Sequence, residues 1–289
     1  MTVHQSITLV ECPRDALQGF SRWVNTSDKI AYYQSLLKVG FHTLDCGSFV
    51  SPKAIPQMSD TAKVIKGLDI SNTPTKLLTI VANERGALDA IKHEEISYLG
   101  YPFSISENFQ VRNTGKTISE SLIILKRISD IASNHNKEMV VYLSMGFGNP
   151  YGDPWNADII AEWVSKMVVM GISIISISDT IGTAIPSDII KLYSTIIPCY
   201  PAITFGAHFH THPDFWYEKV NAAFSAGCLR FDGTIKGMGG CPMAQDKLVG
   251  NMPSEKLISF FTSRKLLPKN LDLFSFESSY NFSQKILTQ

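Results

Sequence analysis

The chain has 289 residues, of which 44% are hydrophobic and 18% are charged, so it can bury a sizeable core. Its 26 basic and 26 acidic residues leave no net charge, which argues against a nucleic-acid or acidic-membrane partner and favours a small-molecule ligand. The N-terminal residues show no secretory pattern, and no window approaches the roughly 18 apolar residues of a membrane span. Five scattered cysteines indicate reduced thiols, so we expect a cytoplasmic protein.

Apolar runs typical of buried strands alternate with amphipathic, helix-like stretches along the whole chain. The predicted strands are residues 7–12, 42–47, 76–82, 95–101, 139–145, 173–179, 203–210 and 228–233. Helical patterns between them include 26–40, 117–136 and 154–171, and Thr117 and Glu120 have the spacing of a capping box. Eight alternations with near-continuous apolar strands favour a closed parallel barrel over an open doubly wound sheet. We therefore predict a single α/β domain over residues 1–289, folded as a (β/α)8 TIM barrel.

Polar side chains follow several of the predicted strands, at the end where barrel enzymes hold their active sites. They are, in chain order, Arg14, Asp15, Asp45, Asp179, His208, His210 and Asp232. The carboxyl ends of parallel strands meet at one face of a barrel. We therefore expect these side chains to converge on one mouth.

His208 and His210 form the sharpest local signal. Residues at i and i+2 of a strand project to the same face, so two imidazoles placed there can hold one cation. Hydrogen-bonded, partly buried histidines without a metal are the structural alternative. Asp15 adds a hard oxygen ligand, which completes a two-histidine, one-carboxylate set with open positions for substrate. This mixed nitrogen and oxygen set favours Mg²⁺ or Mn²⁺, with Zn²⁺ as a tight-binding competitor.

Two further segments follow the last predicted strand. GMGGCPMAQ (237–245) places three glycines around Cys241, whose thiol can donate a proton near neutral pH from a loop that closes over substrate. A tight turn with an incidental cysteine is the alternative reading. GNMPSE (250–255) offers the carbonyl oxygen of Asn251, or simply a capped helix start. We expect a mobile glycine-rich loop over about residues 235–252 and a C-terminal extension over the barrel mouth.

Taken together, these residues resemble the 3-hydroxy-3-methylglutaryl-CoA lyase family, within a larger group of metal-dependent barrel lyases and Claisen-type synthases. The similar motifs are PRDALQ (13–18), SFVSPKAIPQM (48–58), SISENF (104–109), SDTIG (178–182), the two histidines and the GGCP loop. SFVSPK together with GGCP separates the lyases from the synthases. The resemblance implies cleavage of 3-hydroxy-3-methylglutaryl-CoA into acetoacetate and acetyl-CoA by a homodimer, in leucine breakdown or ketone-body metabolism.

The resemblance also implies a divalent-metal site. By this similarity Asp15, His208 and His210 are the metal ligands, and Asn251 completes or supports the set. An acyl-CoA substrate also needs a basic rim near the barrel mouth. The candidates for that rim are Lys53, Arg112 and Lys116.

Catalytic roles follow from the same resemblance. Arg14 stabilises the enolate oxygen, Cys241 transfers a proton, and Asp179 is required for activity. Asp45 stands where relatives usually carry glutamate, and His208 doubles as a proton shuttle. The residues leave open whether Asp179 or His208 is the general base. Three alternatives also stay open: a lyase for a related branched acyl-CoA, a Claisen-type condensing enzyme, and a non-catalytic barrel that binds CoA or metal.

Overall fold

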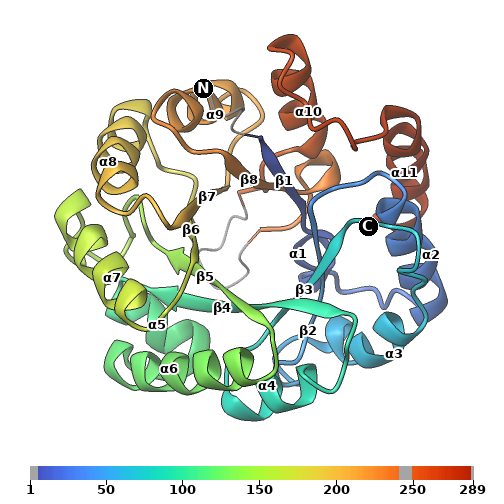
Figure 1. The fold of residues 1–289 in the computed structure, drawn as a ribbon, viewed down its shortest axis with the longest axis horizontal. Coiled ribbons are helices and arrows are strands. Elements are labelled where there is room, and N and C mark those ends of the chain that lie inside the picture. Colours follow the sequence, from blue (N-terminus) through green and yellow to red (C-terminus); the bar gives the residue numbers. More distant parts are fainter. Residues whose placement is uncertain (1–5, 241–248, 288–289) are drawn as a thin grey trace.

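A computed structural model describes residues 6–240 and 249–287. Eight parallel strands pair in chain order and close on themselves as a barrel, because β8 also pairs with β1 (Figure 1). The strands are β1 (Thr8–Glu11), β2 (Thr43–Ser48), β3 (Lys76–Ile80), β4 (Ile96–Ser104), β5 (Glu138–Ser144), β6 (Ile174–Asp179), β7 (Thr204–Phe209) and β8 (Arg230–Gly233). Each overlaps one predicted strand, so the predicted (β/α)8 barrel is confirmed.

Helices surround the barrel and separate its strands (Figure 1). They are α1 (Pro13–Gln18), α2 (Thr26–Leu37), η1 (Pro56–Met58), α3 (Thr61–Lys66), α4 (Glu84–Ala90), α5 (Glu107–Thr114), α6 (Ile118–Asn134), α7 (Ala157–Val169), α8 (Pro186–Cys199), α9 (Trp216–Ser225), η2 (Ile235–Gly237), α10 (Ser254–Ser263) and α11 (Leu273–Ile286). The predicted capping box is confirmed at the start of α6, where Thr117 and Glu120 satisfy each other's backbone N–H groups. Within the described part of the chain, no helix has the length and apolar character needed to cross a bilayer.

Alternation along the strands divides the apolar residues into two sets. Outward-facing residues such as Leu9, Leu44 and Leu77 join the large core between the strands and the helices. A smaller cluster fills the barrel interior and consists of Leu78, Ile80, Tyr98, Val140, Tyr142 and Ile174. Nearer the carboxyl ends, inward positions become polar, as at Ser144 and Ser178, and these residues line the mouth.

The C-terminal helix packs on the flank of the barrel. Helix α11 lies against α2 (Figure 1), and residues just before α11 bond to the turn between α2 and β2. Asn270 Nδ2 donates to Gly40 O at 2.7 Å, and Asp272 N donates to Val39 O at 2.8 Å. That turn precedes a strand, so it lies at the end of the barrel opposite the mouth. At the other end of α11, Ile286 O accepts from Arg22 Nη2 at 3.5 Å in the connection between β1 and α2, on the mouth side. That the C-terminal extension covers the mouth itself stays a prediction.

Candidate metal centre and active site

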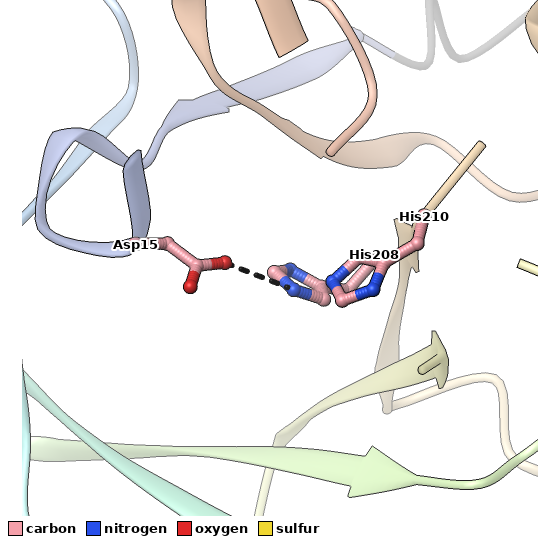
Figure 2. Close-up of side chains that lie close together, drawn as sticks. All are labelled: Asp15, His208 and His210. Carbon is pink, nitrogen blue, oxygen red and sulfur yellow. Dashed lines mark ion pairs between the residues drawn. The ribbon is translucent and has the colours of Figure 1, made fainter. Parts of the chain in front are cut away.

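Asp15, His208 and His210 come together at the carboxyl ends of β1 and β7 (Figure 2). Their potential ligand atoms all lie within 4.8 Å of one another, and Asp15 Oδ2 is 3.5 Å from His208 Nε2. Pro13 starts α1 directly after β1, which places Asp15 in the first helical turn. The alternation of β7 brings both imidazoles to the same side. One carboxylate and two imidazoles within this space fit a divalent cation.

Burial and charge give the three side chains different pKa values. Burial alone would raise the pKa of Asp15, but the positive charge of Arg14, together with the hydrogen bond and charge of His208, holds this pKa well below its usual range. Burial and the neighbouring His208 lower the pKa of His210 to about 4. Burial opposes protonation of His208, yet hydrogen bonds to Asp15 and Asp232 raise its pKa to about 9. At neutral pH, Asp15 and His210 are therefore in their ligand forms, and His208 must exchange a proton for a cation.

Arg14 lies between two carboxylates beside this cluster. Its Nε and Nη2 donate to Asp45 Oδ2 at 3.0 and 2.5 Å, and its Nη1 lies 3.3 Å from Asp15 Oδ1. Gln18 accepts from Arg14 Nη1 at 2.9 Å and donates to Asp15 Oδ1. Burial raises the pKa of Asp45, and the charge of Arg14 opposes that rise. These contacts fix the guanidinium in one orientation, and the short Asp45 side chain reaches it directly.

The mouth contains a pocket of about 360 Å³ lined by Arg14, Asp15, His208 and His210. Its apolar wall is made by Val50, Ile55, Ile80, Pro102, Phe109 and Tyr142. Of the predicted basic rim, Lys116 lines this pocket, whereas Lys53 and Arg112 are exposed on its outside. An adjoining pocket of about 460 Å³ shares Val50, Ser51 and Asn83 and runs between α3 and α4, past Arg85 and Lys92.

Asp179 ends β6 as predicted, but it is 1% exposed and is not among the described residues that line the mouth pocket. Its Oδ2 accepts from Lys219 Nζ at 2.6 Å, and its two oxygens also accept from the backbone N–H groups of residues 183–184. Lys219 Nζ donates in addition to Gly182 O at 2.8 Å and to His210 O at 3.0 Å. The Asp179 carboxylate thus fixes the position of the loop after β6 and, through Lys219, the position of the His210 backbone.

The described parts of the predicted glycine-rich loop contact the segments that carry two of the cluster residues, Asp15 and His210. Asn251 forms an antiparallel bridge with His210, and its Nδ2 donates to Met238 O at 2.9 Å. Gly239 has a φ of 90°, and a Cβ there would lie 2.9 Å from the Cα of Ala16, so this close approach requires glycine. Cys241 lies outside the described residues, so its role and the mobility of this loop stay predictions.

Comparison with known proteins places the chain in a family. A family model described as HMGL-like matches residues 7–282. The chain belongs to the HMGL-like family. Hydroxymethylglutaryl-CoA lyase YngG of Bacillus subtilis is 32% identical over 262 residues, which cover 89% of this chain and 86% of the relative. (R)-citramalyl-CoA lyase of Chloroflexus aurantiacus is 26% identical over 283 residues, covering 93% and 87% of the two chains.

Solved structures agree with this HMGL-like assignment. An HMG-CoA lyase from Acinetobacter baumannii, in complex with coenzyme A and 3-methylmalate, has a TM-score of 0.90. It is 26% identical in sequence, and the match covers 99% of this chain and 93% of that chain. The resemblance predicted from the sequence motifs is therefore confirmed.

Two site residues of this HMGL-like protein were not singled out from the sequence. Gln18 stands three and four residues after Asp15 and Arg14 in one helix, and this spacing was a usable signal because such residues share a helix face. Lys219 had no comparable signal. It lies 40 residues from Asp179, and only the packing of α9 against the end of β6 brings the two together.

Proposed function

We propose that this protein is a divalent-metal-dependent lyase that cleaves 3-hydroxy-3-methylglutaryl-CoA into acetoacetate and acetyl-CoA. The observation that carries the proposal is the Asp15, His208 and His210 cluster beside Arg14 at the barrel mouth. The family supports the same reaction, since relatives 32% and 31% identical are named hydroxymethylglutaryl-CoA lyases.

The chemistry makes two demands on the site. The substrate carries a tertiary hydroxyl β to a thioester, so cleavage needs that hydroxyl to lose its proton and needs the departing acetyl-CoA enolate to be stabilised. A divalent cation, Mg²⁺ or Mn²⁺, held by Asp15, His208, His210 and the amide oxygen of Asn251 would supply Lewis acidity toward the substrate oxygens. The geometry of the first three side chains, within 4.8 Å, supports this ligand set.

Arg14 meets the second demand. Its side chain lines the pocket. The guanidinium is held in place, before any substrate arrives, by Asp45, Asp15 and Gln18. A preorganised cation stabilises a developing oxyanion with little reorganisation, so we assign Arg14 to the enolate oxygen. Cys241 is the proposed donor of the proton that converts the enolate into acetyl-CoA, as the family resemblance implies.

The contacts of Asp179 bear on the identity of the base. A general base must reach the proton that it removes. His208 lines the pocket, whereas the Asp179 carboxylate is engaged by Lys219 and by backbone N–H groups. We therefore assign Asp179 the task of holding the His210 segment in place rather than that of the base.

The adjoining pocket offers a path for the CoA portion of the substrate. It shares the lining residues Val50, Ser51 and Asn83 with the mouth pocket, and Arg85 and Lys92 give it basic side chains. We propose that the CoA tail leaves the mouth through this pocket, with Lys116 contributing from the mouth side. Homodimer formation, a cytoplasmic location and a place in leucine breakdown or ketone-body metabolism are further parts of the proposal and rest on the family resemblance.

A related branched hydroxyacyl-CoA is the second candidate substrate. It is favoured by the (R)-citramalyl-CoA lyase relative and is compatible with the apolar wall of the mouth pocket. The condensing and non-catalytic alternatives have no comparable observation in their favour.

A coupled assay for acetoacetate and acetyl-CoA tests the proposal. Metal-freed protein is supplied with 3-hydroxy-3-methylglutaryl-CoA and Mg²⁺, Mn²⁺ or chelator, and citramalyl-CoA is assayed in parallel. We expect metal-dependent formation of both products, and His210→Ala serves as the folded, metal-deficient control. Turnover of citramalyl-CoA alone would transfer the assignment to the second candidate, and no turnover of either would refute the lyase.

A further inference from the structure

A buried group of charged residues lies directly behind the metal cluster. Asp232 on β8 is 2% exposed, and its Oδ2 lies 3.3 Å from His208 Nδ1. The same oxygen accepts from Ser176 Oγ on β6 at 2.9 Å. The other oxygen, Oδ1, lies 3.7 Å from Arg230 Nε. Three side chains from β6, β7 and β8 therefore meet around one carboxylate.

Arg230 reaches this group from inside the barrel. It is 1% exposed and stands two residues before Asp232, so both side chains point inward from β8. Gly206 on the neighbouring strand makes the space, because a Cβ there would lie 3.1 Å from Arg230 Cδ and 2.8 Å from Ser176 Oγ. Among the described residues, Arg230 Nε and Nη2 have no hydrogen-bond partner. A buried guanidinium is costly, so its ion pair with Asp232 calls for an explanation beyond packing.

The orientation of His208 supplies that explanation. Its Nε2 faces Asp15 at 3.5 Å, on the side of the cation site, while its Nδ1 faces Asp232. An imidazole binds a cation through one nitrogen and commonly donates its other N–H to a carboxylate, which sets both the tautomer and the ring plane. Asp232 is placed to accept that N–H and does not itself reach into the three-residue cluster.

We propose that Asp232 is a positioning residue that holds His208 with Nε2 directed at the cation, that Ser176 holds one oxygen of Asp232 by a hydrogen bond, and that Arg230 attracts the other by its charge. The inference rests on the cation site of the proposed function and adds three residues to it. Its consequence is that metal affinity depends on side chains that never touch the metal.

Mn²⁺ binding to the metal-freed full chain, followed by electron paramagnetic resonance, tests the inference without any turnover. Asp232→Asn is expected to raise the Kd for Mn²⁺ about 10- to 100-fold, the range seen for carboxylates that orient metal-binding histidines. The matched control is Asp60→Asn, which breaks the buried ion pair with Lys29 at 2.8 Å away from the cluster. It should lower the melting temperature of the metal-free protein and leave the Kd unchanged.

Two further variants separate orientation from charge. Ser176→Ala removes one hydrogen bond without changing any charge, so positioning predicts weaker Mn²⁺ binding in the wild-type background and no further loss in Asp232→Asn. Arg230→Met removes a positive charge, which by Coulomb attraction alone would tighten Mn²⁺ binding, whereas loss of positioning weakens it. Should Arg230→Met fail to fold, the Mn²⁺ affinity of Ser176→Ala decides between orientation and charge.

A folded Asp232→Asn protein with wild-type Mn²⁺ affinity would overturn the inference. Tighter Mn²⁺ binding in Arg230→Met would overturn the part assigned to Arg230. Failure of the proposed function would give a different result. A wild-type protein that binds Mn²⁺ tightly but turns over neither acyl-CoA would refute the lyase and leave the positioning of His208 intact.

Discussion

The buried pair of Asp179 and Lys219 gives the sharpest test of the site. Asp179→Asn leaves the Lys219 ammonium, whose side chain is 3% exposed, with no negatively charged partner and with only neutral oxygens around it, among them the carbonyls of Gly182 and His210. Removing one partner of a buried ion pair costs about 3–5 kcal/mol of unfolding free energy. For a chain of this length, that loss corresponds to a fall of roughly 6–10 °C in melting temperature.

The assay is thermal unfolding of the metal-free protein, followed by circular dichroism, together with Mn²⁺ affinity and turnover of the loaded protein. Asp130→Asn is the control, because its ion pair with Lys126 is exposed and should contribute about 0.5 kcal/mol or less. Lys219→Met should be as destabilising as Asp179→Asn, and the double variant should lose less than the sum of the two. An Asp179→Asn protein with wild-type stability and Mn²⁺ affinity but no turnover would refute the role of Asp179 in holding the His210 segment and make Asp179 the base.

Three further outcomes are expected. Burial raises the pKa of Glu11 from 4.5 to about 8, so wild-type stability should fall by a few kcal/mol as pH rises between these values, at about 1.4 kcal/mol per pKa unit. Glu11→Gln keeps an acceptor for Ile235 N and places an amide group beside Ser254 Oγ, which donates to Glu11 Oε2 in the wild type. Its stability to urea should therefore not show this decline with pH, and a decline parallel to that of the wild type would contradict the assignment. His210→Ala should bind little Mn²⁺ by metal analysis of the folded protein, and full occupancy would rule out the ligand set. Cys241→Ser should lose most turnover while retaining Mn²⁺, whereas unchanged turnover would exclude the proton-transfer role.

Local pattern was enough to predict the barrel and the centre of the site. Strand burial and helix amphipathicity repeat within a few residues, so each of the eight strands could be located without knowledge of its neighbours. His208 and His210 share a face because strand side chains alternate, and Asp15 follows the first strand directly. The rule that carboxyl ends of parallel strands meet at one mouth was sufficient to bring these three residues together.

The tertiary structure alone decided what each polar side chain faces. Asp179 and Lys219 are 40 residues apart, and Asp232 and Ser176 are 56 apart, so no local spacing connects either pair. Their contacts depend on strand register, barrel closure and the way α9 packs, which arise from many weak contacts summed over the whole chain. For the same reason, only the closed ring of helices decides that α2 is the surface that α11 covers.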